Sequence, residues 1–229
     1  MARLANVALF KDLTVDLASF EARSSWRRFD PEEILVDFDD LSTDVYFLLS
    51  GEVRVLMRTA AGKEVILDEM RAGELFGELA ALDGIKRSAN VTALTRGEVC
   101  VMPAPIFREA VFSSQQVSER LMRLLSSRIR DLNARLVEQT VLDLRHRLYS
   151  ELLRLSVPRG NGGGGERVVS PPPFHHDLAA RIGCRREQVT REFTLMSHEG
   201  LIERTRGALI LRKPDVLEAR VAEAMREDA

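Results

Sequence analysis

Residues 76–93 of this 229-residue chain read FGELAALDGIKRSANVTA, and four of them suit different parts of a ligand that carries a hydroxyl and a phosphate. Gly77 has no Cβ, so a ligand can approach its backbone closely. An ionised Glu78 accepts hydrogen bonds, as a ribose hydroxyl would require. Arg87 presents a planar, permanently charged group that suits a phosphate, and the Ser88 hydroxyl can donate a further bond to a phosphate oxygen. Together they predict a site that binds a sugar hydroxyl and a phosphate.

The apolar run Leu79–Leu82 inside this stretch predicts one helical turn, whose unpaired backbone N–H groups would also favour an anion. The complete pattern, Phe-Gly-Glu-Leu-Ala, a loop and then Arg-Ser-Ala, resembles the phosphate-binding cassette of cyclic-nucleotide-binding domains. The resemblance implies contacts with a cyclic nucleotide from Gly77, Glu78, Leu79, Arg87, Ser88 and Ala89. The alternative is a surface ion pair between Arg87 and Glu78 in an ordinary β-protein.

The surrounding residues 29–112 have the pattern of a β-domain. Apolar runs at Val45–Leu49, Glu52–Met57 and Glu64–Asp68 are separated by glycine-containing turns. Several short strands at close spacing are typical of a sandwich or barrel. The first two runs also resemble the opening hairpin of the cyclic-nucleotide β-roll.

The apolar period changes to that of a helix at residues 113–139. Five apolar side chains recur at helical spacing, so that they form one stripe: Leu121, Leu125, Ile129, Leu132 and Leu136. Pairing with a second copy as a coiled coil would cover this stripe. Packing against the chain's own β-domain is the alternative, and the two do not exclude each other.

A second helix is predicted at residues 142–156, and it ends as Pro158 requires. The glycine run that follows, between Gly160 and Gly165, suits a flexible hairpin tip or linker. It lacks the Lys-Ser or Lys-Thr of a phosphate-binding P-loop, and no role is assigned to it.

Residues 174–199 read FHHDLAARIGCRREQVTREFTLMSHE and predict two short helices, at 175–182 and 185–199, with a tight turn at Gly183. Five polar residues would face outward from the second helix: Arg185, Arg186, Glu187, Thr190 and Arg191. Arginines and a carboxylate at the start of an exposed helix suit the reading of base edges in a DNA major groove. Residues 201–211 suggest a two-stranded wing behind it.

This segment resembles the helix-turn-helix of the CRP/FNR regulators, and the resemblance extends over roughly residues 8–214. It implies that the family's base-reading Arg-Glu-x-x-x-Arg triplet is Arg186, Glu187 and Arg191, and that the DNA half-site resembles TGTGA in an inverted repeat. Arg185 and Gln188 depart from the family pattern, which affects the expected phosphate contacts and not the triplet. RNA polymerase is a further partner that the resemblance implies.

Charge is unevenly distributed along the chain, whose formal net charge is −2. Residues 1–112 contain 13 basic and 19 acidic side chains, whereas residues 113–213 contain 18 basic and 11 acidic ones. The surplus of positive charge in the second stretch is consistent with a polyanionic partner.

No apolar run in the sequence approaches the roughly 20 residues that span a bilayer. Charged residues interrupt the N-terminal segment, which is therefore a poor match to a signal peptide. We expect a cytoplasmic protein without a membrane partner.

Metal binding and catalysis find little support in the sequence. His175 and His176 beside Asp177 suggest a zinc site or a metal-dependent hydrolase, but the spacing matches no common zinc module, and no nucleophile–base–acid set accompanies them. Cys100 and Cys184 are far apart, and the N-terminal cysteine cluster of the family's iron–sulfur sensors is absent. We expect no metal, no catalytic residues and no enzymatic activity.

The nucleotide base is expected to meet the long helix. In the cAMP-dependent members of the family a Thr-Ser pair contacts adenine, and the aligned pair here is Leu132-Asn133. The Asn133 amide can donate to and accept from a base edge, from either subunit of a dimer, and Ser88 permits adenine or guanine. cAMP is favoured and cGMP stays open.

The sequence therefore predicts an α+β chain with three parts: a cyclic-nucleotide-binding β-roll (1–112), a dimerisation helix (113–140) and a winged helix-turn-helix (141–229). The expected function is that of a homodimeric regulator that binds double-stranded DNA under the allosteric control of a cyclic nucleotide. One alternative is a regulator of the same fold that senses another effector, such as haem-bound gas. Another is a cyclic-nucleotide regulatory subunit that does not bind DNA, against which the Arg186–Arg191 helix argues.

Overall fold

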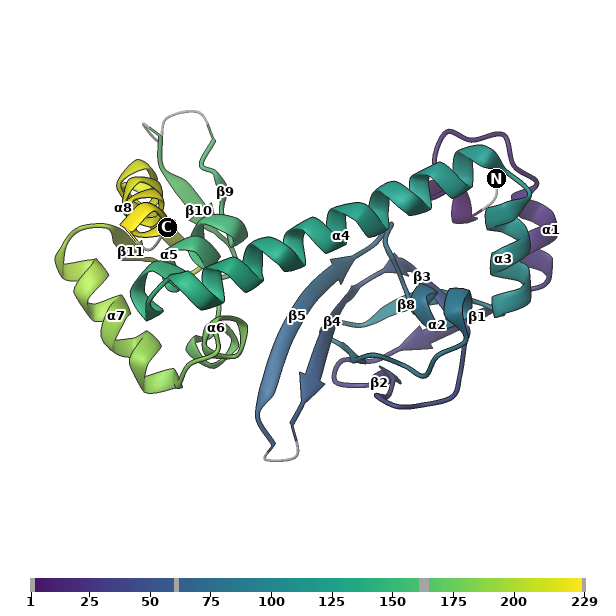
Figure 1. Cartoon of the computed structure of the whole chain (residues 1–229), viewed down its shortest axis with the longest axis horizontal. Coiled ribbons are helices and arrows are strands. Elements are labelled where there is room, and N and C mark those ends of the chain that lie inside the picture. The colour runs from purple at the N-terminus through teal and green to yellow at the C-terminus, as the bar shows by residue number, and fades with distance from the viewer. Residues whose placement is uncertain (1–2, 60–61, 161–164, 228–229) are drawn as a thin grey trace. The chain divides into compact units, whose positions relative to one another are not determined.

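Antiparallel strands and helices occur in both halves of the chain (Figure 1), as the sequence predicts. The computed structural model describes residues 3–59, 62–160 and 165–227. It divides into two units, Met1–Arg128 and Ile129–Ala229, each with its own core. Part of the glycine run, residues 161–164, lies outside the described residues, and so does the hairpin tip expected there.

Two four-stranded antiparallel sheets form the β-domain of the first unit. The first sheet has the order β1 (Ser25–Phe29), β8 (Gly97–Met102), β3 (Val45–Ser50) and β6 (Leu75–Phe76). The second has the order β2 (Ile34–Val36), β7 (Asn90–Ala93), β4 (Glu52–Arg58) and β5 (Glu64–Arg71). The three strands predicted from apolar runs are confirmed as β3, β4 and β5.

Strand β3 is buried on both faces, which explains its unbroken apolar sequence. Tyr46 and Leu48 point into the core between the two sheets. Val45 and Phe47 point the other way, into a second core formed with helical residues. The helices of that second core are η1 (Arg3–Asn6), α1 (Leu17–Ala22), α2 (Glu78–Asp83), α3 (Ala104–Phe112) and the start of α4.

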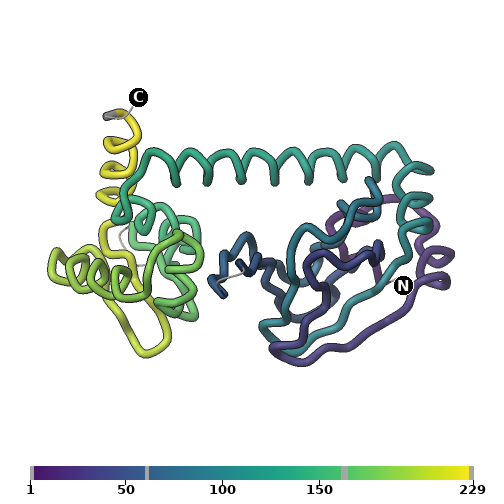
Figure 2. Tube along the Cα trace, turned by 60° about the horizontal axis from the view of Figure 1, so that its bottom comes forward, coloured from purple at the N-terminus to yellow at the C-terminus, as the bar shows by residue number. Residues whose placement is uncertain are grey.

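Helix α4 (Gln115–Val141) runs as one uninterrupted helix (Figure 2), close to the predicted range. Its first turns pack against the β-domain, where Val117 and Leu121 are buried. Farther along, the apolar stripe is exposed, with Ile129 at 58%, Leu132 at 53% and Leu136 at 65% exposure. The chain's own core therefore covers only the beginning of the stripe.

The second unit contains the predicted helix-turn-helix and wing. Its helices are α5 (Leu144–Leu155), α6 (His175–Ile182), α7 (Arg186–His198) and α8 (Pro214–Glu227). Its sheet has the order β11 (Ile202–Arg204), β12 (Leu209–Leu211), β10 (Arg167–Val169) and β9 (Val157–Pro158). The antiparallel pair β11–β12 forms the wing, whose turn is closed by a hydrogen bond from Thr205 N to the Ala208 carbonyl oxygen (2.9 Å).

Ion pairs fix the helix-turn-helix to α5. Glu151 of α5 is 3% exposed and contacts Arg181 of α6 (Nη1–Oε1 3.3 Å) as well as Arg154 of α5. Arg145 of α5 bonds Glu192 of α7 through Nε and Oε2 at 2.9 Å. A buried pair keeps its partners in place because separating them would leave a charge without compensation in the interior. Both helices of the helix-turn-helix, α6 and α7, are thus joined to α5 by ion pairs.

Candidate functional sites

Gly77 directly follows β6 and begins the cassette in a conformation that only glycine adopts readily. Its φ is 84° and ψ 5°, and it caps α2 (Glu78–Asp83). A Cβ at this position would lie 2.7 Å from Arg87 Nη1 and 2.8 Å from the Asp44 carbonyl oxygen. Both distances are too short for contact, so glycine is required if Arg87 is to keep its place.

Arg87 is held inside the first unit with 3% exposure. Its Nε donates to Ser42 Oγ (3.1 Å), its Nη1 to the Gly77 carbonyl oxygen (3.0 Å) and its Nη2 to the Asp44 carbonyl oxygen (2.8 Å). The guanidinium also lies 5.7 Å from the centre of the Tyr46 ring. Among the described residues, the hydrogen-bond partners of this side chain are therefore neutral oxygens.

A buried guanidinium that is bonded to neutral oxygens keeps a positive charge without a matching carboxylate. Placing such a charge away from water is costly unless an anion compensates it. Three of the five N–H groups of Arg87 are used by the three bonds above, which leaves two for a ligand. The geometry suits one anionic group of low charge, such as a phosphodiester. It does not support a surface ion pair between Arg87 and Glu78, because neither side chain is at the surface.

Glu78 is paired with an arginine that sequence reasoning missed. The carboxylate is 5% exposed, and its Oε1 accepts a bond of 2.8 Å from Arg128 Nη1 on α4. Arg128 Nη2 also donates to the Leu75 carbonyl oxygen at 2.9 Å. A signal was present in the sequence: Arg128 stands three residues after Leu125 and four before Leu132, so a charge occupies the apolar face of the helix. A charge at such a position needs a buried partner.

The structure brings Gly77, Glu78 and Arg87 together and leaves other predicted ligand residues in open positions. Ser88 is exposed, Leu79 is 46% exposed and Ala89 is half-buried. Leu132 and Asn133 are exposed on α4 and belong to the second unit. Their assignment to the base of a nucleotide stays a prediction.

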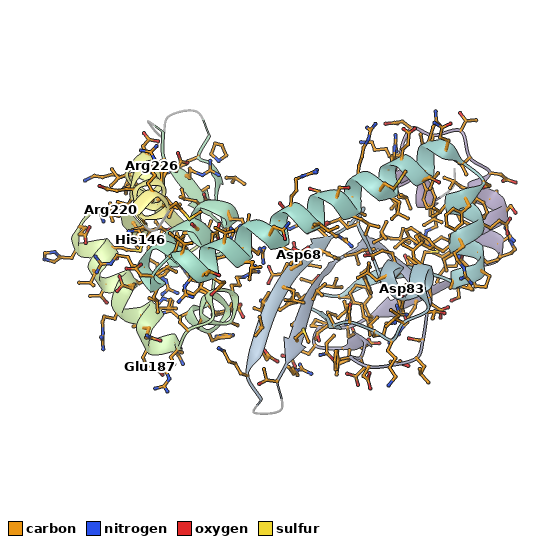
Figure 3. All side chains as sticks on the ribbon, in the orientation of Figure 1. Asp68, Asp83, His146, Glu187, Arg220 and Arg226 are labelled. Atoms are coloured by element: carbon orange, nitrogen blue, oxygen red, sulfur yellow. The ribbon has the colours of Figure 1, made fainter. Side chains whose placement is uncertain are left out.

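The helix-turn-helix buries one face of α7 and exposes the other. Val189, Phe193 and Met196 enter the core of the second unit, whereas all five residues predicted to meet DNA are exposed. The turn between α6 and α7 uses Gly183 with a φ of 75°. Glu187, the second residue of α7, lies at the N-terminal end of this helix (Figure 3).

Two polar residues at the start of α7 are already engaged within the protein. The Gln188 Oε1 accepts a hydrogen bond from Arg185 N at 3.0 Å, which caps the helix. The Thr190 hydroxyl donates to the Arg186 carbonyl oxygen at 3.1 Å. By contrast, the side chains of Arg186, Glu187 and Arg191 form no hydrogen bond or ion pair with the described residues, so they are available to an external partner.

Both sites match known families. Residues 26–114 match the cyclic nucleotide-binding domain, and residues 146–220 match the Crp-like helix-turn-helix domain. The cyclic AMP receptor protein of Thermus thermophilus is 30% identical over 182 residues, which cover 78% of this chain and 80% of that protein. The chain belongs to the CRP/FNR family. It is a CRP-like DNA-binding transcription regulator with a cyclic nucleotide-binding domain.

Two further similarities extend this comparison. The CRP-like cAMP-activated global transcriptional regulator of Mycobacterium tuberculosis is 29% identical over 158 residues, 69% of this chain and 70% of that protein. The fold is similar to that of the c-di-GMP responsive global regulator CLP of Xanthomonas campestris, with a TM-score of 0.72 at 20% identity, over 85% of this chain and 97% of that one. Such relatives are transcription regulators, not enzymes.

The described residues contain neither a metal-ligand cluster nor a membrane-spanning helix. Among them, no group of three or more His, Cys, Asp or Glu side chains is placed to hold a metal ion. His176 pairs with Asp177 (Nε2–Oδ1 3.3 Å), and His175 points instead toward Thr190. None of the helices in this part of the chain is long and apolar enough to cross a bilayer.

Proposed function

We propose that the chain is a homodimeric regulator whose affinity for DNA is controlled by a cyclic nucleotide bound at the cassette, Gly77 to Ala89. The observation that carries the proposal is the buried Arg87 guanidinium, bonded to three neutral oxygens. Two arginines and one carboxylate, Arg87, Arg128 and Glu78, leave one net positive charge at the cassette. A cyclic nucleotide has one phosphodiester and so supplies one compensating negative charge.

The ribose would bind at Glu78. The bond from Arg128 engages one carboxylate oxygen, Oε1, so Oε2 can accept from a ribose hydroxyl. Because Arg128 is at the middle of α4 and also bonds the Leu75 carbonyl oxygen, a ligand at Glu78 would act on the long helix at that point. A ligand that favours one arrangement of this helix by a few kcal/mol shifts the population toward it.

cAMP is the effector we favour, with cGMP as the alternative. Relatives that match most of this chain are named as cAMP-activated or as a cyclic AMP receptor protein. Asn133 and Ser88 could serve either purine, since an amide and a hydroxyl each donate and accept. The fold is similar to that of the c-di-GMP responsive regulator CLP, so this larger dinucleotide belongs in the test.

Calorimetric titration of the ligand-free protein with cAMP, cGMP and cyclic di-GMP tests the effector. We expect saturable binding of cAMP, with one site per chain. If binding heat is observed only with cyclic di-GMP, or with none of the three nucleotides, the cassette is not a site for cAMP or cGMP.

We expect Asn133→Ala to weaken cyclic-nucleotide binding by about 1–3 kcal/mol, as for a lost buried hydrogen bond. The loss should differ between cAMP and cGMP, because the amide would contact the base, where the two nucleotides differ. Competition titrations of both nucleotides measure this. Gln139→Ala, which removes an exposed amide from the same helix, is the control. An equal loss for cAMP and cGMP would remove Asn133 from the base site.

The dimer would form along α4, whose exposed apolar stripe from Ile129 to Leu136 suits a second copy of the same helix. Two helix-turn-helix units on a two-fold dimer would contact major grooves about one helical turn, or 34–36 Å, apart. The DNA site would then be an inverted repeat with TGTGA-like halves. We place the protein in the cytoplasm with its DNA, and RNA polymerase is the further partner we propose.

Glu187→Ala should relax the preference at one base pair by roughly 1–3 kcal/mol, because Glu187 would accept from a cytosine amine. The salt dependence of binding should stay the same, since phosphate contacts are unchanged. Selection from random DNA with both proteins measures the preference, and Glu218→Ala on α8, an exposed carboxylate outside the helix-turn-helix, is the control. An identical motif from both proteins would remove Glu187 from base reading.

A further inference from the structure

His175, the first residue of α6, links the two helices of the helix-turn-helix. Its Nδ1 lies 2.8 Å from Thr190 Oγ1 on α7, and its ring lies 4.6 Å from the ring of Phe193 (centroid to centroid). Its second nitrogen, Nε2, is buried and has no hydrogen-bond partner in the described part of the chain. An unpartnered buried nitrogen beside the recognition helix requires a physical reason.

The hydrogen bonds define which nitrogen carries the proton. The Thr190 hydroxyl has one hydrogen, and it donates that hydrogen to the Arg186 carbonyl oxygen. The arrangement that satisfies both contacts has the hydroxyl accepting from His175, with the imidazole proton on Nδ1. Nε2 then holds a lone pair, and a second proton can be added there without breaking the bond to Thr190.

The charged groups around His175 favour its neutral form in the free protein. Burial lowers the pKa of His175, and the positive charges of Arg204 on the wing and Arg186 on α7 lower it further. On its own helix, the neighbouring carboxylate Asp177 is paired with His176. The other groups of α7 beside the ring, Thr190 and Phe193, are uncharged.

We propose that His175 takes up a proton when the winged helix-turn-helix binds double-stranded DNA, so that DNA binding strengthens as the pH falls. The inference rests on the proposed contact between α7 and DNA. The negative potential of the DNA phosphates would offset the positive charges of Arg204 and of the base-reading Arg186, which weakens the repulsion that opposes protonation of Nε2. The polyanion would also stabilise a new positive charge at the interface.

The direction in which DNA affinity changes with pH follows from proton linkage. In the complex the affinity of His175 for a proton is raised, so its contribution to DNA binding is full below the free-protein pKa. That contribution is lost as the pH rises through the pKa of the complex. Folding responds in the opposite direction: a lowered pKa in the folded chain adds stability at higher pH that is lost as the pH falls through it. Acid should thus weaken the fold slightly while it strengthens DNA binding.

The test measures the affinity of the full-length protein with cAMP for a duplex carrying an inverted TGTGA repeat, between about pH 5.5 and 7.5 at constant salt. Uptake of one whole proton changes affinity about tenfold per pH unit, so we expect wild-type binding to weaken about three- to tenfold over this range. His175→Asn should lose this dependence, because Asn keeps an N–H donor for Thr190 but does not titrate. His176→Asn and His198→Asn, which replace exposed histidines of the same helices, should keep it.

A second measurement needs no variant. Calorimetric heats of DNA binding in two buffers with different ionisation enthalpies report the number of protons taken up, which should be above zero for wild type and near zero for His175→Asn. Equal pH profiles for wild type and His175→Asn, or no uptake by wild type, would overturn the proton linkage and leave DNA binding intact. Failure to bind the duplex at every pH would instead overturn the DNA-reading function with it.

Discussion

Arg87→Leu should remove nearly all cyclic-nucleotide binding, with a loss of roughly 2–5 kcal/mol. The leucine side chain has no donor for a phosphate. The substitution also removes a positive charge that, in the structure, is hydrogen-bonded only to the neutral oxygens of Ser42, Gly77 and Asp44. Calorimetric titration with cAMP measures the loss. The matched control is Lys86→Leu, which removes the neighbouring cation, an exposed side chain that pairs with Asp39 at 2.8 Å.

Folding of the Arg87→Leu protein must be checked separately, because the substitution removes the Arg87 donor from two partly buried carbonyl oxygens, those of Gly77 and Asp44. Unpaired buried acceptors cost about 1–3 kcal/mol each in stability, so the variant should melt at a lower temperature but still cooperatively. Arg87→Lys is the second variant: it keeps the charge without the fork and should bind cAMP more weakly than wild type but better than Arg87→Leu. Affinity of a folded Arg87→Leu protein within about threefold of wild type would show that the phosphate binds elsewhere.

Ile129→Glu combined with Leu136→Glu should convert the proposed dimer into monomers. Two carboxylates from each chain would enter the shared apolar seam, where charges without partners are costly. Both positions are exposed in the single chain, at 58% and 65%, so each monomer should remain folded. Leu125 is less suitable, because it is partly buried against the core of the first unit.

Light scattering reports the mass of this variant, and specific DNA binding should be lost with the dimer, since two half-sites must be held together. Ser127→Glu with Ala134→Glu adds the same charge at exposed positions on another face of α4 and serves as the control. If the variant with Ile129→Glu and Leu136→Glu is still a dimer, the subunit contact lies outside this stripe.

Much of the fold could be predicted because local signals agree with the final packing. The glycine at position 183 and the apolar spacing of Val189, Phe193 and Met196 predict α6 and α7 to within one residue of their ends. The unbroken apolar run of β3 likewise indicates a strand covered on both faces. What periodicity does not reveal is which strands pair, for instance that β3 lies between β8 and β6, because pairing depends on contacts distant in sequence.

The candidate nucleotide site shows the same division. Gly77, Glu78 and Arg87 are near one another in sequence, so their association could be predicted from one motif. Ser42 and Asp44 hold Arg87 from a loop more than 40 residues away, with sequence separations of 45 and 43. Only the folded chain reveals such partners. The sequence indicates that Arg128 needs a buried acidic partner, because its charge lies on the apolar face of a helix. The sequence does not indicate that this partner is Glu78.

The DNA site could be predicted as a face of α7 but not in its details. Thr190 is exposed as expected, yet its hydroxyl is already used by Arg186 and His175. Side-chain bonds between neighbouring helices depend on the angle at which the helices meet, which the sequence pattern does not specify. A contact of Thr190 with DNA would therefore have to use its methyl group or replace one of these bonds.

The most direct measurement of cyclic-nucleotide control is the affinity of the full-length protein for its selected duplex with and without saturating cAMP. We expect cAMP to tighten binding by about 5- to 150-fold, the range typical of coupled sites. Arg87→Leu should bind the duplex with the affinity of the ligand-free protein whether or not cAMP is present. Equal affinity of the wild-type protein with and without cAMP, or an unchanged response in Arg87→Leu, would contradict control of DNA binding by a nucleotide at this cassette.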